Sequence, residues 1–169
     1  MNCAITAFMK REQTVDYNIK SAWHAISRMY NSYGIHFDVT ASTGFVLLNI
    51  DIDEGTPATK IAPMMGMESR SLTRMLKSME EKKWIYRQKD PEDGRSVRIF
   101  LTDLGKEKRE ISRQSVKEFN KRILDQIPIA QLKIFFEVIG VINDVADDKA
   151  TIQGFVENMQ SQLAEQLTA

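Results

Sequence analysis

A central segment of the chain places four polar side chains at helical spacing, and their chemistry suits contacts with nucleic acid. The four side chains are Arg70, Thr73, Arg74 and Lys77, which recur at i, i+3, i+4 and i+7. Guanidinium, ammonium and hydroxyl groups can donate hydrogen bonds to phosphate oxygens and base edges, and the major groove of DNA is wide enough to admit an α-helix. Ser69 and Ser71 lie beside this stripe and offer further phosphate or base contacts. The alternative is an ordinary surface helix whose charges are only solvated.

The same segment carries a second stripe, which would orient the first. It consists of Leu72, Met75, Leu76 and Met79 at the same spacing. At about 100° per residue, the centres of the two stripes lie nearly opposite each other on a helix. Burial of the apolar stripe in a core would therefore point the cationic stripe outward.

A β-hairpin is predicted directly after this helix. Residues 84–88 (WIYRQ) and 96–101 (SVRIFL) have strand character, and residues 90–94 (DPEDG) have the composition of a turn. Arg95 follows the turn and is expected to enter the minor groove, whose negative potential attracts arginine, while Asp93 holds its guanidinium in orientation. The alternative is an exposed ion pair that only fixes the turn.

A shorter helix is expected before the cationic helix. Thr56 is predicted as its N-cap and Pro57 as its first residue, and it should run to about Met65, with Gly66 in the following turn. Because Pro63 lies inside this segment, we expect the helix to bend or end early. Two helices followed by a hairpin indicate a winged helix-turn-helix, mainly α with a small β-hairpin wing.

Two runs of residues are similar to the MarR family of bacterial transcription regulators. Residues 90–107 (DPEDGRSVRIFLTDLGKE) resemble that family's wing, strand and following helix start, and residues 69–88 (SRSLTRMLKSMEEKKWIYRQ) resemble its recognition helix and the exit into the wing. A lighter likeness extends from about Tyr17 to about Asp147. The resemblance implies homodimers that bind pseudo-palindromic operators, usually as repressors, often released by small phenolic or lipophilic ligands or by cysteine oxidation.

The chain departs from the family pattern at two positions. Lys83 stands where the family usually has glycine after the recognition helix, so we expect this helix end to lack an easy left-handed cap. Glu92 occupies a wing position where many relatives carry arginine, which makes the wing less cationic and leaves Arg95 as its one strong minor-groove candidate.

The charge of the chain is unevenly distributed. The whole sequence holds 23 basic and 23 acidic residues, a net charge of zero that by itself argues against a nucleic-acid-binding protein. Residues 60–109, however, carry 13 Lys or Arg against 8 Asp or Glu, a balance of +5. Positive charge is therefore concentrated on the winged-helix segment, where it would attract DNA in a salt-dependent manner.

The length of 169 residues and the hydrophobic content of 43% suit one compact domain. Within it we expect a DNA-binding lobe at about 40–105 and dimerisation helices at about 14–33 and 106–169. The flanking helices carry three apolar stripes: Val15, Ile19, Ala22, Ile26 and Met29; Val116, Phe119 and Ile123; and Leu132, Phe135, Phe136, Ile139 and Ile142. A core within one subunit could use each stripe, but a winged lobe is too small to cover all three. A two-fold dimer would place two recognition helices roughly 34 Å apart, one turn of DNA.

The last segment, residues 150–169, repeats an apolar pattern at Ile152, Phe155, Val156, Met159 and Leu163. We expect one more interface helix here. Asp147, Asp148 and Gly154 interrupt the pattern, and the alternative is a loosely held tail.

A break in helical periodicity at Gly34 precedes a further helix, for which Thr40 is the predicted cap. This break could border a cavity for a small apolar or aromatic effector. The candidate lining residues are Trp23, Tyr30, His36, Phe37 and Phe45. The alternative is that these side chains simply belong to the core.

Other classes of protein find little support. Cys3 is the only cysteine, so no internal disulfide forms and a reducing cytoplasm fits; it lies in an apolar stretch without a basic neighbour, so redox sensing is not expected. The two histidines, His24 and His36, form no metal-binding pattern, and no phosphate loop or nucleophile motif occurs, so neither enzyme, metal nor cofactor is expected. No apolar run suits a membrane span or signal peptide.

The sequence thus predicts a homodimeric regulator that binds double-stranded DNA. The alternative is a winged-helix protein used for protein interaction or ligand binding without sequence-specific DNA contacts, a reading that Pro63, Lys83 and Glu92 favour.

Overall fold

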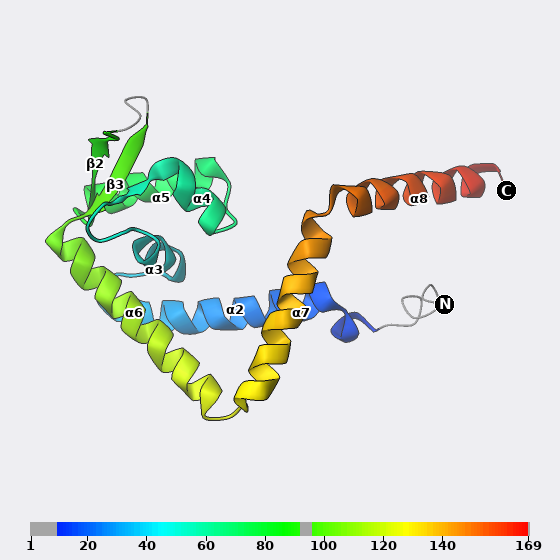
Figure 1. Cartoon of the computed structure of the whole chain (residues 1–169), viewed down its shortest axis with the longest axis horizontal. Helices are drawn as coiled ribbons and strands as arrows, with labels where there is room; N and C mark the ends of the chain where they lie inside the picture. The colour runs from blue at the N-terminus through cyan, green and yellow to red at the C-terminus, as the bar shows by residue number, and fades with distance from the viewer. Residues whose placement is uncertain (1–9, 92–95, 169) are drawn as a thin grey trace. The chain divides into compact units, whose positions relative to one another are not determined.

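The computed structural model describes residues 10–91 and 96–168, with side chains described up to residue 164. Figure 1 shows mainly helices with one small antiparallel sheet, as predicted. The elements are η1 (Arg11–Gln13), α2 (Val15–Gly34), η2 (Ile35–Phe37), α3 (Ala41–Leu48), β1 (Thr56–Pro57), α4 (Ala58–Met64), α5 (Ser69–Glu81), β2 (Ile85–Lys89), β3 (Val97–Leu101), α6 (Asp103–Leu124), α7 (Ile129–Asp147) and α8 (Lys149–Thr168).

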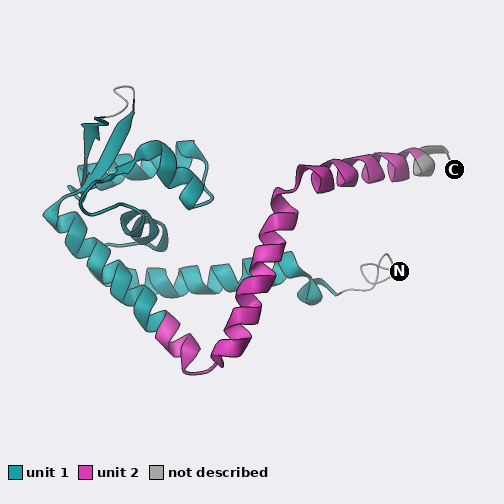
Figure 2. Ribbon diagram, in the orientation of Figure 1, with its two compact units in different colours: residues 1–119 teal, residues 120–169 magenta. Residues whose placement is uncertain are grey.

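The chain divides into two compact units, residues 1–119 and 120–169 (Figure 2). The first unit holds the sheet and helices α2 to α5, together with most of α6. The second holds the end of α6 with α7 and α8. None of the described helices is both long and apolar enough to cross a membrane.

The core of the first unit is built from the apolar positions of α3, α4, α5 and the sheet. Its most deeply buried side chains are Val46, Leu47, Ile50, Ile61, Met79, Ile85 and Ile99. On α5, Leu72 and Leu76 are buried beside Met79, and Met75 packs against the same core. The predicted apolar stripe of this helix is therefore confirmed. Removal of such side chains from water contributes about 1.5–3 kcal/mol each.

Helix α3 begins at the predicted cap. The Thr40 hydroxyl accepts a hydrogen bond from the Thr43 amide at 3.2 Å, and the Thr43 hydroxyl accepts one from the Thr40 amide at 2.9 Å. Two amides that the helix leaves without intrahelical partners are satisfied in this way, which fixes where the helix starts.

Helix α4 starts one residue later than predicted, so the assignment of Thr56 as its N-cap is wrong. Pro57 holds that position, and the Thr56 hydroxyl instead accepts from the Asp51 amide at 2.9 Å. The helix ends at Met64, directly after Pro63, in agreement with the expected early end. Gly66, at φ 58°, then makes the turn to α5.

The sheet has the order β1-β3-β2, with all neighbours antiparallel. The predicted hairpin is confirmed as β2 and β3, and its register pairs Ile85 with Leu101. Strand β1 was not predicted, because it has two residues and one of them is proline. Its proline lies on a sheet edge, where the missing amide is tolerated.

Helix α5 ends in a left-handed residue although no glycine is available. Lys83 adopts φ 57° and donates from its amide to the Glu80 carbonyl at 2.9 Å, while the Trp84 amide donates to the Met79 carbonyl at 2.9 Å. These two bonds form a Schellman motif with lysine at the position that glycine usually occupies. The expectation that this end would lack a left-handed cap is therefore wrong.

In the second unit, α7 and α8 meet at the interruption that the sequence indicated. The Asp148 carboxylate accepts from the Ala150 amide at 3.0 Å and from the Thr151 hydroxyl at 2.6 Å. These hydrogen bonds lower the pKa of Asp148, that from Thr151 most strongly. Asp148 thus starts a separate helix, and residues 149–168 are helical, as expected, instead of forming a loose tail.

Candidate DNA-binding surface

Helix α5 presents its polar stripe to solvent, as the sequence predicted. All six residues of the stripe and its flanks are exposed: Ser69, Arg70, Ser71, Thr73, Arg74 and Lys77. They are held outward because Leu72, Leu76 and Met79 anchor the other face in the core. The orientation of the polar groups therefore follows from the packing of the apolar ones.

The first turn of α5 adds backbone donors to this surface. Glu68 is the N-cap and its side chain makes no capping hydrogen bond, and the amides of Ser69 and Arg70 have no acceptor among the described residues. Free amides at a helix N-terminus, together with the helix dipole, favour an anionic oxygen such as that of a phosphate.

Thr73 differs from its neighbours in how its hydroxyl is used. Its hydroxyl donates to the Ser69 carbonyl at 2.8 Å, within the helix. In this rotamer the side chain offers an accepting lone pair and a methyl group, but no free donor. Such a group suits a base-edge donor or the methyl of thymine better than a phosphate.

The basic side chains around the sheet fall into two groups. Several are tied to the protein itself: Lys82 pairs with Asp38 at 2.7 Å, Arg87 with Glu80 at 2.9 Å, Arg98 with Asp90 at 3.2 Å and Lys106 with Asp103 at 3.6 Å. In contrast, no ion pair or side-chain hydrogen bond with a described residue engages Arg70, Arg74 or Lys77. The exposed face of α5 thus concentrates cations that the fold leaves unneutralised.

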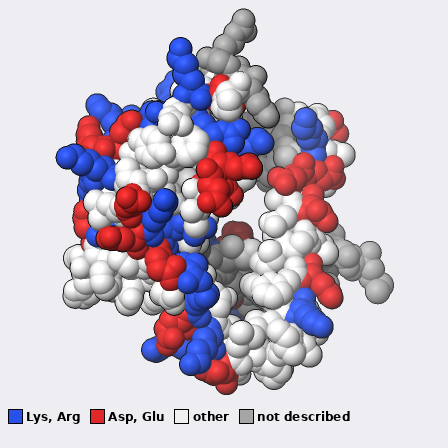
Figure 3. Space-filling view, turned by 60° about the vertical axis from the view of Figure 1, so that its left-hand side comes forward, with Lys and Arg blue, Asp and Glu red and all other residues white. Residues whose placement is uncertain are grey.

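Acidic side chains are interspersed with the basic ones on part of the surface. On the face drawn in Figure 3, Asp and Glu side chains lie among the Lys and Arg side chains. On this face, therefore, the positive balance of the sequence does not form a uniformly basic surface.

A partly buried ion pair fixes the base of the hairpin. The Arg98 guanidinium donates to the Asp90 carboxylate at 3.2 Å and to the Glu54 carbonyl at 3.2 Å, and the two paired side chains are 18% and 5% exposed. The Asp90 amide also donates to the Ser96 carbonyl at 3.1 Å. The predicted tip residues Asp93 and Arg95, like Glu92, lie outside the described residues.

The loop before β1 is ordered by a carboxylate. Asp51 accepts from the amides of Glu54 at 2.8 Å and Asp53 at 2.9 Å, and these backbone hydrogen bonds lower its pKa. Because the Glu54 carbonyl receives Arg98, this turn helps to hold the hairpin base.

Two basic residues near this surface were not singled out from the sequence. Lys60 on α4 and Lys89 at the end of β2 are exposed, and neither has an ion pair with a described residue. They contributed to the charge balance of residues 60–109, but neither belongs to a periodic stripe. The folded structure, and not the sequence pattern, makes them candidates for DNA contacts.

A small cavity lies between α2, α3 and α6 within the first unit. It encloses about 30 Å³ and is lined by Tyr30, Tyr33, Gly34, Val39, Thr40, Ala41, Gly44, Phe45, Leu48, Ile111, Ser112, Ser115 and Val116. In this conformation it is large enough for only one or two water molecules, because a single water needs roughly 10–15 Å³.

The five predicted effector-binding residues are only partly brought together. Tyr30 and Phe45 line the cavity and meet edge to face, with ring centroids 5.9 Å apart. Trp23 contacts the Phe45 ring at 5.7 Å from outside the lining, and Phe37 packs on Tyr33 at 5.4 Å. The fifth, His36, is exposed and is not part of the lining.

Comparison with known proteins extends this picture. The sequence profile of the MarR family matches residues 39–97, which include α3 to β2 and the first residue of β3. The HTH-type transcriptional regulator SarZ of Staphylococcus saprophyticus is 31% identical over 110 residues, which span 63% of this chain and 75% of that protein. The chain belongs to the MarR family.

Solved structures of this family share the fold. The S. aureus MepR–DNA complex superposes with a TM-score of 0.70 at 21% identity, covering 78% of this chain and 98% of that one. CouR from Rhodococcus jostii RHA1 bound to p-coumaroyl-CoA superposes with a TM-score of 0.68 at 16% identity, covering 79% and 94%. At these identities the superpositions establish the common architecture.

Proposed function

We propose that this MarR-family protein is a homodimeric transcription regulator that binds a pseudo-palindromic operator in double-stranded DNA, as a repressor. One observation carries the proposal: Arg70, Arg74 and Lys77 project from the exposed face of α5 without an ion pair among the described residues, whereas Lys82, Arg87 and Arg98 are paired. Charges left free in this way are available to DNA phosphates and bases.

The residues of the surface have distinct proposed roles. Arg70, Thr73, Arg74 and Lys77 face the major groove, and Ser69 and Ser71 contact phosphate or bases. Arg95, oriented by Asp93, enters the minor groove, and its removal should weaken binding to every duplex and lower the salt dependence. The solved complex of the related MepR contains DNA, which supports this use of the fold.

The homodimer is supported by exposed apolar side chains in each unit. In the first unit they lie on α2, and in the second on α7: Val15, Ile19, Trp23, Ile134, Phe135, Phe136, Val138 and Val141. Apolar patches of this extent on a single subunit usually mark an interface. We therefore assign residues 14–33 and 106–169 to dimerisation and residues 40–105 to the DNA-binding lobe of one MarR-like domain. Sedimentation should show a dimer that Phe136→Asp dissociates.

Three further properties accompany the proposal. The relatives are transcription regulators, and we propose that this protein likewise acts without catalysis and without a cofactor, in the cytoplasm. A small apolar or aromatic effector would release the DNA. The related CouR binds p-coumaroyl-CoA, which supports an effector of this class.

The proposal is tested by selection of duplexes from a random DNA pool with the purified full-length protein at near-physiological salt. We expect an inverted repeat with half-sites about one helical turn apart. Recovery of no sequence would contradict the proposal and favour the winged-helix interaction protein.

Variants of α5 then separate base contacts from phosphate contacts. Arg74→Gln should reduce the discrimination between operator and random duplex by about 1–3 kcal/mol if this side chain reads a base. Lys77→Gln should lower the salt slope by about one unit, as expected for a lost phosphate contact. Lys106→Gln is the matched control, since Lys106 pairs with Asp103 on α6. Equal effects of the two lysine changes would contradict the assigned surface.

A further inference from the structure

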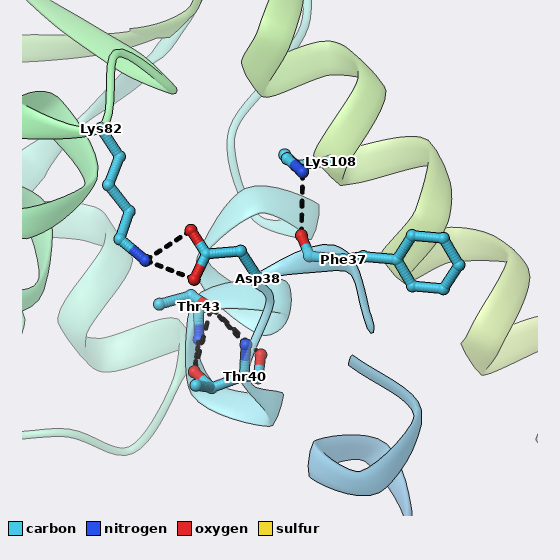
Figure 4. Close-up of polar contacts among 6 residues, drawn as sticks. All are labelled: Phe37, Asp38, Thr40, Thr43, Lys82 and Lys108. Carbon is cyan, nitrogen blue, oxygen red and sulfur yellow. Dashed lines mark hydrogen bonds and ion pairs between the residues drawn. The ribbon is translucent and has the colours of Figure 1, made fainter. Parts of the chain in front are cut away.

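One ion pair joins the loop before α3 to the end of the recognition helix. The Lys82 ammonium donates to both oxygens of Asp38 at 2.7 Å, and the two residues are 44 positions apart in the sequence (Figure 4). The paired side chains are 41% and 66% exposed, so the pair lies at the surface. Exposed ion pairs usually contribute less than about 1 kcal/mol to stability, so stability alone gives little reason for this geometry.

The backbone on each side of the pair is held in an uncommon conformation. Asp38 has φ 58° and Lys83, next to Lys82, has φ 57°. Among the described residues these are the two non-glycine positions with positive φ. A left-handed residue other than glycine costs roughly 1–2 kcal/mol and persists only where its surroundings hold it. The ion pair thus joins left-handed Asp38 to Lys82, the direct neighbour of left-handed Lys83.

A second lysine, on α6, also binds the loop before α3. Lys108 on α6 donates to the Phe37 carbonyl at 2.8 Å. The ammonium groups of Lys82 and Lys108 lie 4.9 Å and 5.9 Å from the centroid of the buried Trp84 ring. Residues 37 and 38 are thus held by two cations that share one aromatic ring, and Trp84 directly follows the left-handed end of α5.

The same loop forms one wall of the cavity. Gly34, Val39 and Thr40 line it, and the Val39 amide donates to the Gly34 carbonyl at 3.0 Å. A side chain at Gly34 would collide with the Val39 carbonyl, so the loop closes tightly on α2. Asp38, which pairs with Lys82 at the end of α5, directly precedes the lining residue Val39 in this loop.

We propose that Asp38 and Lys82 are positioning residues for DNA recognition: their ion pair sets the tilt of α5 relative to the loop at residues 34–40. The pair touches no DNA in this role. It fixes the C-terminal end of the helix, so that the exposed side chains of the first turns reach the base edges together. This inference rests on the proposed function, since it assigns residues that orient the same α5 surface.

The test uses Asp38→Asn in the full-length protein, with affinity measured for the selected operator and for a random duplex. Asparagine tolerates the left-handed conformation, so the backbone is preserved while the charge is lost. Electrostatics alone predicts tighter DNA binding, because the variant has one negative charge fewer. Positioning predicts the opposite sign: we expect operator affinity to fall at least about five-fold, the lower end of common coupling effects, with little change for random DNA.

The matched control is Asp53→Asn, because Asp53 is an exposed carboxylate of the same lobe whose side chain makes no hydrogen bond or ion pair with a described residue. It should leave operator affinity unchanged or raise it. Lys82→Gln should lower the operator preference as Asp38→Asn does, and the double variant should be no worse than either single one. Urea midpoints should stay close to the parent value, which separates positioning from loss of fold.

Two results would overturn the inference in different ways. If Asp38→Asn binds the operator as tightly as Asp53→Asn does, the ion pair does not position α5, and the proposed function stands. If the parent protein retains no duplex, the proposed function fails and the positioning role fails with it.

Discussion

Replacement of Lys83 by glycine should leave the protein more stable than replacement by alanine, although glycine is the less stable of the two in a regular helix. Lys83 has φ 57° and ends α5 through two hydrogen bonds that involve its own amide and that of Trp84. Glycine adopts this conformation without the steric cost of a Cβ atom. The Lys83 side chain is exposed and makes no ion pair with a described residue, so its removal breaks no such contact.

The magnitude follows from two opposing effects on the free energy of unfolding. Relief of the left-handed conformation contributes about 1–2 kcal/mol. The greater freedom of glycine in the unfolded chain offsets about 0.4–1 kcal/mol of this gain. The charge of Lys83 near the helix C-terminus also favours the helix, and Lys83→Ala removes that charge while it keeps the Cβ atom. We therefore expect Lys83→Gly to exceed Lys83→Ala in stability by roughly 0.5–1 kcal/mol.

The assay is urea unfolding of the three proteins at one protein concentration, because the stability of a dimer depends on concentration. The urea midpoint should be higher for Lys83→Gly than for Lys83→Ala, and the dependence of the free energy of unfolding on urea concentration should be the same for both. A glycine variant less stable than the alanine variant would refute the left-handed assignment of Lys83, since glycine is the weaker residue at ordinary helical positions.

Three other changes test separate parts of the fold. Arg98→Ala should lower the free energy of unfolding by about 3 kcal/mol, measured by urea denaturation, because it removes the guanidinium that pairs with the buried carboxylate of Asp90; a loss typical of a surface residue would contradict this. The pKa of Asp148 lies below its ordinary 3.8, so its cap on α8 is present above that pH and is lost as the pH falls through the lower folded value. The hydrogen-exchange protection factors of amides in the first turn of α8 should fall on acidification more in the parent than in Asp148→Asn, and identical profiles would count against the cap. Gly34→Ala should cost about 1–3 kcal/mol by thermal or urea unfolding, since its methyl group meets the Val39 carbonyl, whereas unchanged stability would show that the loop can move aside.

Part of the candidate surface could be predicted because local periodicity decides it. Any core that accepts Leu72 and Leu76 must turn Arg70 and Arg74 to solvent, whatever the rest of the fold looks like. The capping residue Thr40 was predictable for a similar reason, since its partners lie within one helical turn.

Other features escaped prediction because they depend on contacts between distant segments. Thr56 has the character of a helix cap, but pairing with β3 draws it into the sheet, and its hydroxyl serves the preceding loop. Lys83 was expected to leave the helix end open, yet the burial of Trp84 holds the chain in the left-handed turn.

The sequence by itself determined the amphipathic helices, the hairpin and the direction in which the recognition helix presents its cations, because these follow from the spacing of side chains along a regular backbone. Only the tertiary structure decided which cations remain without an ion pair among the described residues. Lys82 and Lys77 are alike in the sequence, but one reaches a carboxylate 44 residues away and the other reaches none among the described residues. Neutralisation of a charge requires a partner within a few ångströms, and that proximity exists only once the chain has folded.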